Sequence, residues 1–508
     1  MPQLKAHLKI NKNFCIEEKP GDTILVVFGA SGDLTERKII PALFNLYQKK
    51  LLPKKFFVLA CARTKLDDIS FRDQIKSSLM QTNYQGTQDV LTVFCNLFFY
   101  LSGDYHDPRT YADLSLLLDK TGKKNCNLLF YLATPPVVYD PIVENLGKAG
   151  LVKDCHEGIF YPRVVVEKPF GHDLSSALEL NAKLRDILAE RQIYRIDHYL
   201  GKETVQNILM FRFANTIFEP VWNRQYIDHV QITVAEDIGV GHRAGYYDKA
   251  GHLRDIFQNH MFEMMALVAM EPPASFEADR IRDQKTEFFR SIRPVQLTDI
   301  VRAQYKEGII KNTVVPSYRQ EQGVPPDSVT ETFVAAKLWV DSWRWHDVPF
   351  FLKTGKRLAK GFSEIAIKFK HVPHSIFGPI HSVDMPSNEL VFNVQPNEGI
   401  ALTIQAKYPG PKLCMSTLTM DLFYKDVMET EMPSPYERLL IDCMLGDQTL
   451  FIRQDEIELE WGLVDPILKS WELEPSVREL KFYPAGSWGP AEADELIGSE
   501  GRCWHRQN

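Results

Sequence analysis

Residues 23–34 read TILVVFGASGDL, an apolar run that ends in a turn with two glycines. Such a run is typical of a strand buried on both faces of a parallel sheet. In a strand-to-helix turn, G-x-x-G glycines let the backbone approach a pyrophosphate, whose charge the N–H groups at the helix start attract. On its own the pattern also fits an ordinary tight turn. We predict a dinucleotide-binding loop made of Gly29, Ala30, Ser31, Gly32, Asp33 and Leu34.

Alternating short apolar runs and helical patterns continue from this loop to about residue 200. This alternation indicates a parallel sheet covered by helices on both faces. After the fifth run, Asp173 stands where an N-cap would begin a helix. We therefore predict that residues 1–200 form a doubly wound, Rossmann-like nucleotide-binding domain. Its strands are expected at 23–28, 56–60, 98–101, 127–133, 163–167 and 193–196.

The pattern changes in residues 201–508. Apolar and polar residues alternate around 230–234, 334–340, 365–369, 390–394 and 400–404, which predicts a mostly antiparallel sheet with one apolar face. Between two of these runs, apolar residues recur at helical spacing from Leu253 to Val268. The second half is therefore expected to be a larger α+β domain.

Composition excludes several classes of protein. The 508 residues carry 59 Lys plus Arg against 66 Asp plus Glu, a net charge of −7, which favours neither nucleic acid nor an anionic membrane as a partner. No stretch reaches the roughly 18 apolar residues of a membrane span, and the first twenty residues do not read as a signal peptide. We expect a soluble, cytoplasmic protein.

Neither a disulfide framework nor a metal site is predicted. The eight cysteines form no C-x-x-C pair. The nearest histidine group, at 371, 374 and 381, is interrupted by prolines and lacks ligand spacing, so we interpret it as a loop.

The end of the second strand bears on which nucleotide is bound. It reads Ala62, Arg63, Thr64, Lys65, where an NAD site usually has an acidic residue for the ribose hydroxyls. Cations at this place favour a 2′-phosphate, so Ser31, Arg63 and Lys65 point to NADP. A solvent-facing arginine at a strand end is the simpler alternative.

Two polar groups follow predicted strands of the first half. Glu167 and Lys168 stand at the carboxyl end of a strand, where open α/β sheets bind ligands, and a cis Pro169 would aim Lys168 into the crevice. The stretch 195–203 then places His198, Tyr199 and Lys202 within five residues, a set of donors that can surround a phosphate.

A third group comprises Glu236, Asp255 and His260. Glu236 has the parity of the apolar residues of its strand, and His260 lies within the apolar helical stripe. A histidine there is most often a packed core residue, but it becomes a plausible general base if the stripe faces a cleft. Asp255 is about 140° from His260 around an ideal α-helix and is expected to flank that face.

Seven motifs together resemble the glucose-6-phosphate dehydrogenase family, in order along residues 24–490. The nine-residue block at 195–203 is the most specific of them. The motifs are GASGDL (29–34), EKPFG (167–171), RIDHYLGKE (195–203), RDIFQNH (254–260), VPFFLKTGK (348–356), QPNE (395–398) and YERLL (436–440).

The resemblance implies oxidation of β-D-glucose 6-phosphate at C1 to the δ-lactone with reduction of NADP, the entry to the pentose phosphate pathway. It implies that His260 is the general base and that Asp197 orients it. His198, Tyr199 and Lys202 match the phosphate-binding positions, and Lys168 lies between sugar and cofactor. The sugar-binding positions match Glu236, Asp255 and Lys356.

The resemblance also implies a homodimer or homotetramer, with residues 201–508 serving substrate binding and assembly. One departure is Gly361, where the family often has a basic residue; Lys360 is adjacent. Two alternatives stay open. A sugar oxidoreductase of the glucose–fructose oxidoreductase type would accept unphosphorylated glucose, and a non-catalytic NADP-binding redox sensor would tolerate loss of His260.

Overall fold

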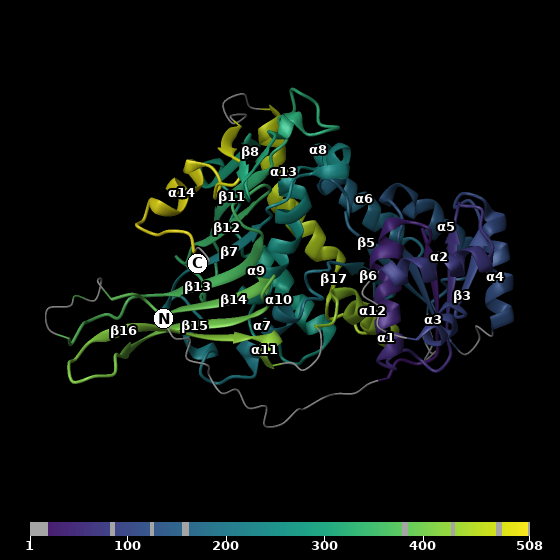
Figure 1. The fold of residues 1–508 in the computed structure, drawn as a ribbon, viewed down its shortest axis with the longest axis horizontal. Coiled ribbons are helices and arrows are strands. Elements are labelled where there is room, and N and C mark those ends of the chain that lie inside the picture. Colours follow the sequence, from purple (N-terminus) through teal and green to yellow (C-terminus); the bar gives the residue numbers. More distant parts are fainter. Residues whose placement is uncertain are drawn as a thin grey trace.

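The computed structural model shows two parts side by side, each built on one large sheet (Figure 1). Within the residues it describes, none of the helices combines the length and hydrophobicity needed to cross a bilayer. The described residues are 19–81, 87–121, 126–154, 162–377, 381, 385–427, 432–473 and 480–505.

Seven strands form the first sheet, in the order β17-β6-β5-β4-β1-β2-β3. The strands β1 to β6 are parallel in the doubly wound order, and β17 pairs antiparallel with β6. The six predicted strands are confirmed, with ends that differ by at most two residues. The strands are β1 (Thr23–Phe28), β2 (Phe56–Ala62), β3 (Phe98–Ser102), β4 (Asn127–Leu132), β5 (Arg163–Glu167), β6 (Ile193–Ile196) and β17 (Phe451–Ile452).

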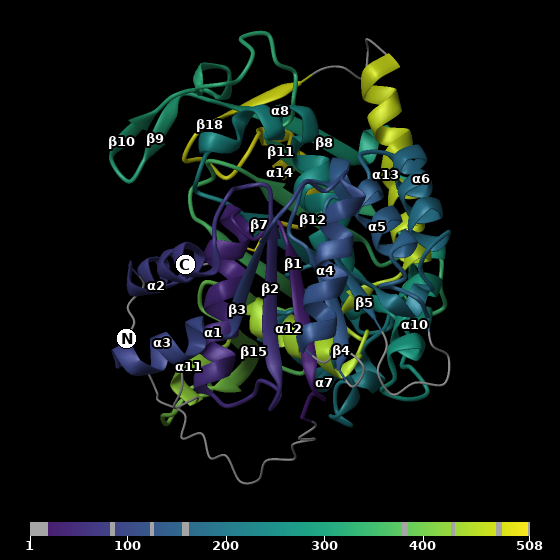
Figure 2. The ribbon, with the colours of Figure 1, turned by 90° about the vertical axis from the view of Figure 1, so that its right-hand side faces the viewer.

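Helices cover both faces of this sheet (Figure 2). Asp173 is the predicted N-cap: its Oδ1 accepts a hydrogen bond from the backbone N–H of Ser176 at 2.7 Å. The helices are α1 (Ile40–Gln48), α2 (Asp68–Gln81), α3 (Gln88–Cys95), α4 (Pro108–Thr121), α5 (Tyr139–Lys148) and α6 (Leu174–Arg185).

The second sheet has the order β16-β15-β14-β13-β7-β12-β11-β8-β18 and is mostly antiparallel, as predicted. Two of its pairs, β7 with β12 and β8 with β18, are parallel. The strands are β7 (Ile227–Ala235), β8 (Ile300–Lys306), β11 (Phe333–Leu338), β12 (Phe350–Gly355), β13 (Phe362–Phe369), β14 (Glu389–Gln395), β15 (Gly399–Lys407), β16 (Met415–Phe423) and β18 (Lys481–Pro484). A separate hairpin joins β9 (Gly308–Ile310) to β10 (Thr313–Val315).

The prediction that only one face of this sheet is apolar is wrong for its central strands. In β11, Val334 and Ala336 enter a core shared with the first part, while the intervening Phe333 and Ala335 enter a second core. That second core contains residues of α14 (Ala491–Gly498), which covers the opposite face. The intervening residues are themselves apolar, so both faces had to be covered.

The chain returns to the first part near its end. After α12 (Pro435–Leu445), the strand β17 joins the first sheet beside β6, and α13 (Gln454–Leu473) packs against α6. The strand β17 thus completes the first sheet although it lies in residues 201–508. A division of the chain at residue 200 separates this strand from its sheet. The remaining helices are α7 (Glu203–Phe213), α8 (Ala244–His252), α9 (Phe262–Ala269), α10 (Ala278–Arg290) and α11 (Tyr424–Val427).

A π-helical segment, Leu253–Met261, separates α8 from α9. Gly251 lies inside α8 at a kink, with φ = +73°, and a Cβ there would lie 2.3 Å from Glu331 Oε1. The same Glu331 oxygen accepts the backbone N–H of Leu253 at 3.0 Å and so caps the segment that follows. In a π-helix the hydrogen bonds run from i to i+5, so residues five apart lie on the same face.

Candidate active site

The predicted dinucleotide loop lies at the carboxyl end of β1. Gly29 has φ = +83°, and a Cβ there would lie 2.2 Å from the carbonyl oxygen of Ala133, so a larger residue cannot replace it. The Gly29 carbonyl accepts from Gly32 N at 2.9 Å and from Thr35 Oγ1 at 3.1 Å. These bonds close the turn just before the helix begins. The loop therefore has the backbone form that a bound pyrophosphate requires.

Arg63 follows β2 at the same edge of the sheet. Its side chain is exposed, and its guanidinium lies 5.8 Å from the centre of the Tyr105 ring. The hydroxyls of Ser31 and Thr64 lie 2.9 Å apart and join the two loops. A cation and two hydroxyls thus face solvent beside the dinucleotide loop.

Glu167 and Lys168 end β5, but their side chains contact different partners. Tyr131 donates a hydrogen bond to Glu167 Oε1 at 2.5 Å, and burial raises the pKa of Glu167 to about 7. Lys168, followed by the cis peptide bond to Pro169, donates to the backbone oxygen of Asp255 at 3.1 Å. Lys168 therefore reaches the second part, whereas Glu167 contacts Tyr131 of β4 and Tyr436 of α12.

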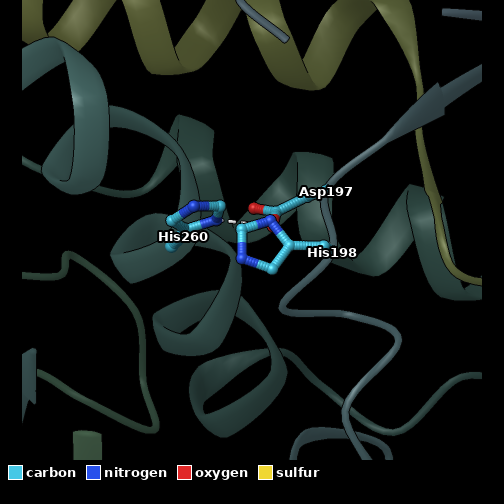
Figure 3. Close-up of side chains that lie close together, drawn as sticks. All are labelled: Asp197, His198 and His260. Atoms are coloured by element: carbon cyan, nitrogen blue, oxygen red, sulfur yellow. Dashed lines mark hydrogen bonds and ion pairs between the residues drawn. The ribbon is translucent and has the colours of Figure 1, made fainter. Parts of the chain in front are cut away.

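His260 and Asp197 form a hydrogen-bonded pair at the junction of the two parts (Figure 3). Asp197 directly follows β6, and its Oδ1 lies 2.5 Å from His260 Nδ1. Lys168 Nζ contacts the other ring nitrogen, Nε2. Because an ammonium only donates, Nε2 must accept, and the proton of the neutral ring is on Nδ1. Nε2 is therefore the basic atom of the pair.

The charges around this pair suit a general base. Burial lowers the pKa of His260 and Lys168 lowers it further, against the opposing effect of Asp197. Burial raises the pKa of Asp197, but His260 and Lys168 lower it more strongly, so it lies well below its usual value. At neutral pH the carboxylate is ionised and the imidazole is neutral, the state in which Nε2 can take a proton.

The prediction that Asp255 only flanks the face of His260 is wrong. Both residues line one pocket of about 360 Å³, together with Lys168. The α-helical geometry behind the prediction does not apply, because both residues belong to the π-helical segment and are five positions apart. Burial raises the pKa of Asp255, but Lys168 and Lys356 lower it more, so the carboxylate is ionised at neutral pH.

Glu236 and Lys356 form another wall of the same pocket. Glu236 directly follows β7 and Lys356 directly follows β12, and these two strands are parallel neighbours. The Lys356 Nζ lies 2.5 Å from Glu236 Oε2. The parallel pairing, which the sequence pattern did not indicate, brings the two side chains to one sheet edge. Their charges face the pocket as a donor and an acceptor for hydroxyl groups.

Of the three predicted phosphate-binding residues, His198 and Tyr199 lie against His260. The Tyr199 ring stacks on the imidazole with centroids 4.2 Å apart, and the His198 ring lies 4.7 Å from it, edge to face. Lys202 Nζ contacts Gln395 Oε1 and lies 4.4 Å from the centre of the Tyr199 ring. His198 and Tyr199 line the pocket, while Lys202 lies just behind Gln395. Burial lowers the pKa of Lys202 to about 8.

Asp197, His198 and His260 are also of the kinds that ligate metals, and their potential ligand atoms all lie within 4.8 Å of one another. Two ligands of one Zn²⁺, each at about 2.0–2.2 Å from the ion, lie more than 3 Å apart in tetrahedral geometry. The 2.5 Å between Asp197 and His260 is instead a hydrogen-bond distance. This group therefore has the geometry of a hydrogen-bonded pair with an adjacent imidazole.

Four further polar residues of the pocket had no predicted role: Gln395, Arg243, Tyr246 and Tyr247. Gln395 ends β14 within the QPNE motif, so the motif was the available signal. Arg243 and Tyr247 lie at the start of α8, where no pattern singles them out. Neither Lys360 nor Gly361 lines the pocket, and a Cβ at Gly361 would lie 3.0 Å from Asp237 Oδ1.

Comparisons with known proteins cover both parts of the chain. Residues 26–207 match the family model described as "Glucose-6-phosphate dehydrogenase, NAD binding domain". Residues 209–505 match the model described as "Glucose-6-phosphate dehydrogenase, C-terminal domain". The two matches together span nearly the whole chain.

Curated relatives are similar over nearly their full length. The glucose-6-phosphate 1-dehydrogenase of Treponema pallidum (strain Nichols) is 45% identical over 492 residues, 95% of each chain. The glucose-6-phosphate 1-dehydrogenase of Aggregatibacter actinomycetemcomitans is 44% identical over 495 residues, which covers 96% of this chain and 98% of the relative.

Two solved structures have the same fold. A glucose-6-phosphate dehydrogenase in complex with its substrate glucose-6-phosphate matches with a TM-score of 0.89 and 35% identity, covering 97% of this chain and 100% of that one. The glucose-6-phosphate 1-dehydrogenase from Mycobacterium avium matches with a TM-score of 0.81 and 36% identity, covering 96% and 99%.

Proposed function

Because this chain belongs to the glucose-6-phosphate dehydrogenase family, an oxidoreductase family acting on CH–OH groups, we propose that the pocket around His260 oxidises C1 of β-D-glucose 6-phosphate to the δ-lactone. The observation that carries this proposal is the Asp197–His260 pair with the basic Nε2 facing Lys168 in one pocket. A site of this kind takes a proton from a hydroxyl while a hydride leaves the same carbon.

In the proposed reaction the C1 hydroxyl replaces Lys168 as the group that donates to His260 Nε2. Nε2 takes the proton as the C1–O bond becomes a carbonyl, and Asp197 stabilises the resulting imidazolium. Lys168 stays beside the reacting oxygen, where its charge favours the developing negative character of that oxygen. No further base is needed, because one proton and one hydride leave the sugar.

The nucleotide is proposed to be NADP, which supplies the hydride acceptor when bound. The loop Gly29–Leu34 would hold the pyrophosphate, since Gly29 leaves no room for a side chain against Ala133. Arg63, with Ser31 and Thr64 beside it, would hold the 2′-phosphate. The chain has Arg63 at the position where an NAD site usually has an acidic residue for the ribose hydroxyls, and this supports a preference for NADP.

The substrate is proposed to bind by its two ends. The 6-phosphate contacts His198, Tyr199 and Lys202, and the sugar hydroxyls contact Glu236, Asp255 and Lys356. Support comes from the pocket, which is lined by five of these residues and backed by Lys202. The phosphate is remote from C1, so its binding energy can orient the reacting carbon.

A single set of assays tests this function. Nucleotide reduction is measured with glucose 6-phosphate and with plain glucose, each with NADP and with NAD. We expect severe loss of activity without the phosphate and a preference for NADP. Equal activity on plain glucose would instead favour a sugar oxidoreductase of the glucose–fructose type, and no activity with any pair would favour a redox sensor.

Assembly and location are also proposals. We propose a homodimer or homotetramer, which sedimentation of the purified chain would test by giving a mass of two or four copies. We propose that the protein acts in the cytoplasm. Its six described cysteines are free thiols, as expected in a reducing compartment; Cys15 and Cys155 lie outside the described residues. Cell fractionation tests this location.

A further inference from the structure

Three residues after His260, Glu263 begins a second group of ionisable side chains. Lys285 Nζ of α10 lies 2.5 Å from Glu263 Oε2 and 2.5 Å from Glu456 Oε2 of α13. Glu460, one turn further along α13, completes the group. We call Glu263, Lys285, Glu456 and Glu460 the buried carboxylate cluster. All four side chains are at most 1% exposed, and none lines the pocket.

The cluster has three carboxyl groups and only one cation. Three ionised carboxylates around one ammonium would leave uncompensated charge in a dry interior, which is strongly unfavourable. Within the described residues, Glu263 Oε1 and Glu460 Oε1 are buried without a hydrogen-bond partner. Burial raises the pKa of Glu263, and burial together with the nearby Glu263 carboxylate raises the pKa of Glu460 well above its usual value. At least one carboxyl group of the cluster is therefore protonated, and the raised pKa assigns that proton to Glu460.

Gln258 connects this cluster to the active site. Its Nε2 donates a hydrogen bond of 2.9 Å to Glu460 Oε2, and it is buried. Gln258 lies in the π-helical segment between Asp255 and His260. The segment is thus held at its start by Glu331, in its middle by Glu460, and just beyond its end by Lys285 through Glu263.

The form of this segment sets the angle between Asp255 and His260 around the helix axis. In an α-helix, Asp255 would stand about 140° from His260, as the sequence predicted. In the π-helical segment they share a face and line the same pocket. The contacts that stabilise the π-helical segment therefore determine whether Asp255 and His260 can act on the same substrate molecule.

We propose that Gln258 and Glu460 are positioning residues, which through their hydrogen bond hold the wide helical turn that brings Asp255 and His260 to the same pocket. Glu460 serves as the neutral acid, and its Oε2 accepts the hydrogen bond from Gln258. The inference rests on the roles proposed above for Asp255 and His260. It assigns a catalytic purpose to a cluster that touches neither substrate nor cofactor.

The test compares Gln258→Leu with three variants of α13. Gln258→Leu keeps the size of the side chain and removes the bond to Glu460. We expect kcat to fall on the order of 10- to 100-fold, because displacements of about 1 Å cost this much. The KM for glucose 6-phosphate should rise as Asp255 leaves the pocket, while the KM for NADP stays within about twofold, since the nucleotide loop is untouched.

The α13 variants test whether Glu460 is neutral. Glu460→Gln keeps an uncharged acceptor for Gln258, so we expect kcat within about threefold of wild type, whereas Glu460→Leu should match Gln258→Leu. Glu458→Gln is the control, because Glu458 contacts Asn181 on the other side of the helix. It should behave as wild type.

Two outcomes would overturn the inference. Wild-type kcat and KM in Gln258→Leu would show that the bond does not position the segment. A Glu460→Gln variant as impaired as Glu460→Leu would show that Glu460 acts as an ionised group. His260→Asn is measured in parallel: if it is inactive while Gln258→Leu is normal, the inference fails and the proposed function stands. Should Glu460→Leu not fold, the other two variants still decide.

Discussion

Two groups of buried charged side chains lie along one helical segment of this protein. They differ in whether a ligand can reach them. In the group of Asp197, Lys168 and His260, the lysine and the histidine line a pocket of about 360 Å³, and the imidazole presents a basic nitrogen there. The buried carboxylate cluster is sealed among α9, α10 and α13. Both contain a lysine whose pKa is lowered by burial and raised by nearby carboxylates. Burial and perturbed pKa values alone therefore do not separate a catalytic group from a structural one; access to a ligand does.

The comparison is tested most severely by His260→Asn. The asparagine is close in size but lacks a basic nitrogen, so we expect turnover to fall roughly 10²- to 10⁴-fold. The affinity for glucose 6-phosphate should change little, because the phosphate-binding residues remain. Steady-state kinetics and equilibrium binding measure the two effects separately. Turnover at the wild-type rate would remove His260 as the base.

In the buried carboxylate cluster, Lys285→Met should chiefly lower the stability of the fold. It leaves Glu263 and Glu456 without their cation, and breaking a buried pair in this way costs about 3–5 kcal/mol of unfolding free energy. Denaturant unfolding measures the loss. Lys148→Met, which removes a lysine from an exposed pair with Glu144, is the matched control and should change stability little. Equal effects of the two variants would contradict the difference drawn between the groups.

At the pocket, Lys202→Ala tests the proposed contact with the substrate phosphate. If Lys202 receives the substrate phosphate, its loss removes a charged hydrogen bond, and KM should rise roughly 10- to 100-fold with a small change in kcat. Lys54→Ala, an exposed lysine of the first part, should leave KM unchanged. An unaltered KM in Lys202→Ala would place the phosphate elsewhere.

Glu167 allows a test by pH, because burial raises its pKa to about 7 while the unfolded chain has the ordinary value of 4.5. A raised carboxyl pKa stabilises the fold fully below about 4.5, and this contribution is lost as pH rises to about 7. Glu167→Gln should therefore reduce the fall in unfolding free energy across this window by up to about 1.4 kcal/mol per pH unit. Parallel curves for wild type and variant would show that Glu167 does not titrate there.

The smallest expected effect is that of Arg63→Ala. The exposed guanidinium is proposed to contact the 2′-phosphate, so its loss should narrow the NADP-over-NAD preference roughly tenfold. Comparing kcat/KM for the two nucleotides gives the ratio, and Lys65→Ala shows whether the neighbouring cation shares the role. If the ratio of kcat/KM for NADP to kcat/KM for NAD is unchanged in Arg63→Ala, the Arg63 side chain does not determine which nucleotide is preferred.

Much of the first part could be predicted because its signals are local. The strands β1 to β6 are short apolar runs between helical patterns, and the order of motifs places Gly29 and Lys168 at one sheet edge. Asp197 and His260 were named from motifs, and the structure brings them within 2.5 Å of each other. Local pattern sufficed where neighbours in the sequence determine the geometry.

The rest depends on partners that are distant in the sequence. The α-helical rule misplaced Asp255 because the hydrogen bonds of a π-helical segment span one residue more than those of an α-helix, a difference that apolar periodicity does not resolve. The parallel pairing of β7 with β12, which aligns Glu236 and Lys356, joins strands more than a hundred residues apart. The buried carboxylate cluster likewise draws on three helices, and single-residue patterns do not show such meetings.

The two-residue strand β17 has a consequence for how this protein can be divided. It covers the outer edge of β6, the strand that leads directly into Asp197. A fragment ending before residue 451 would expose that edge, and open sheet edges recruit other chains. The nucleotide-binding half is thus not an autonomous module that could be transplanted or expressed by its own residues. The edge of its sheet is completed by a strand from the C-terminal part of the chain.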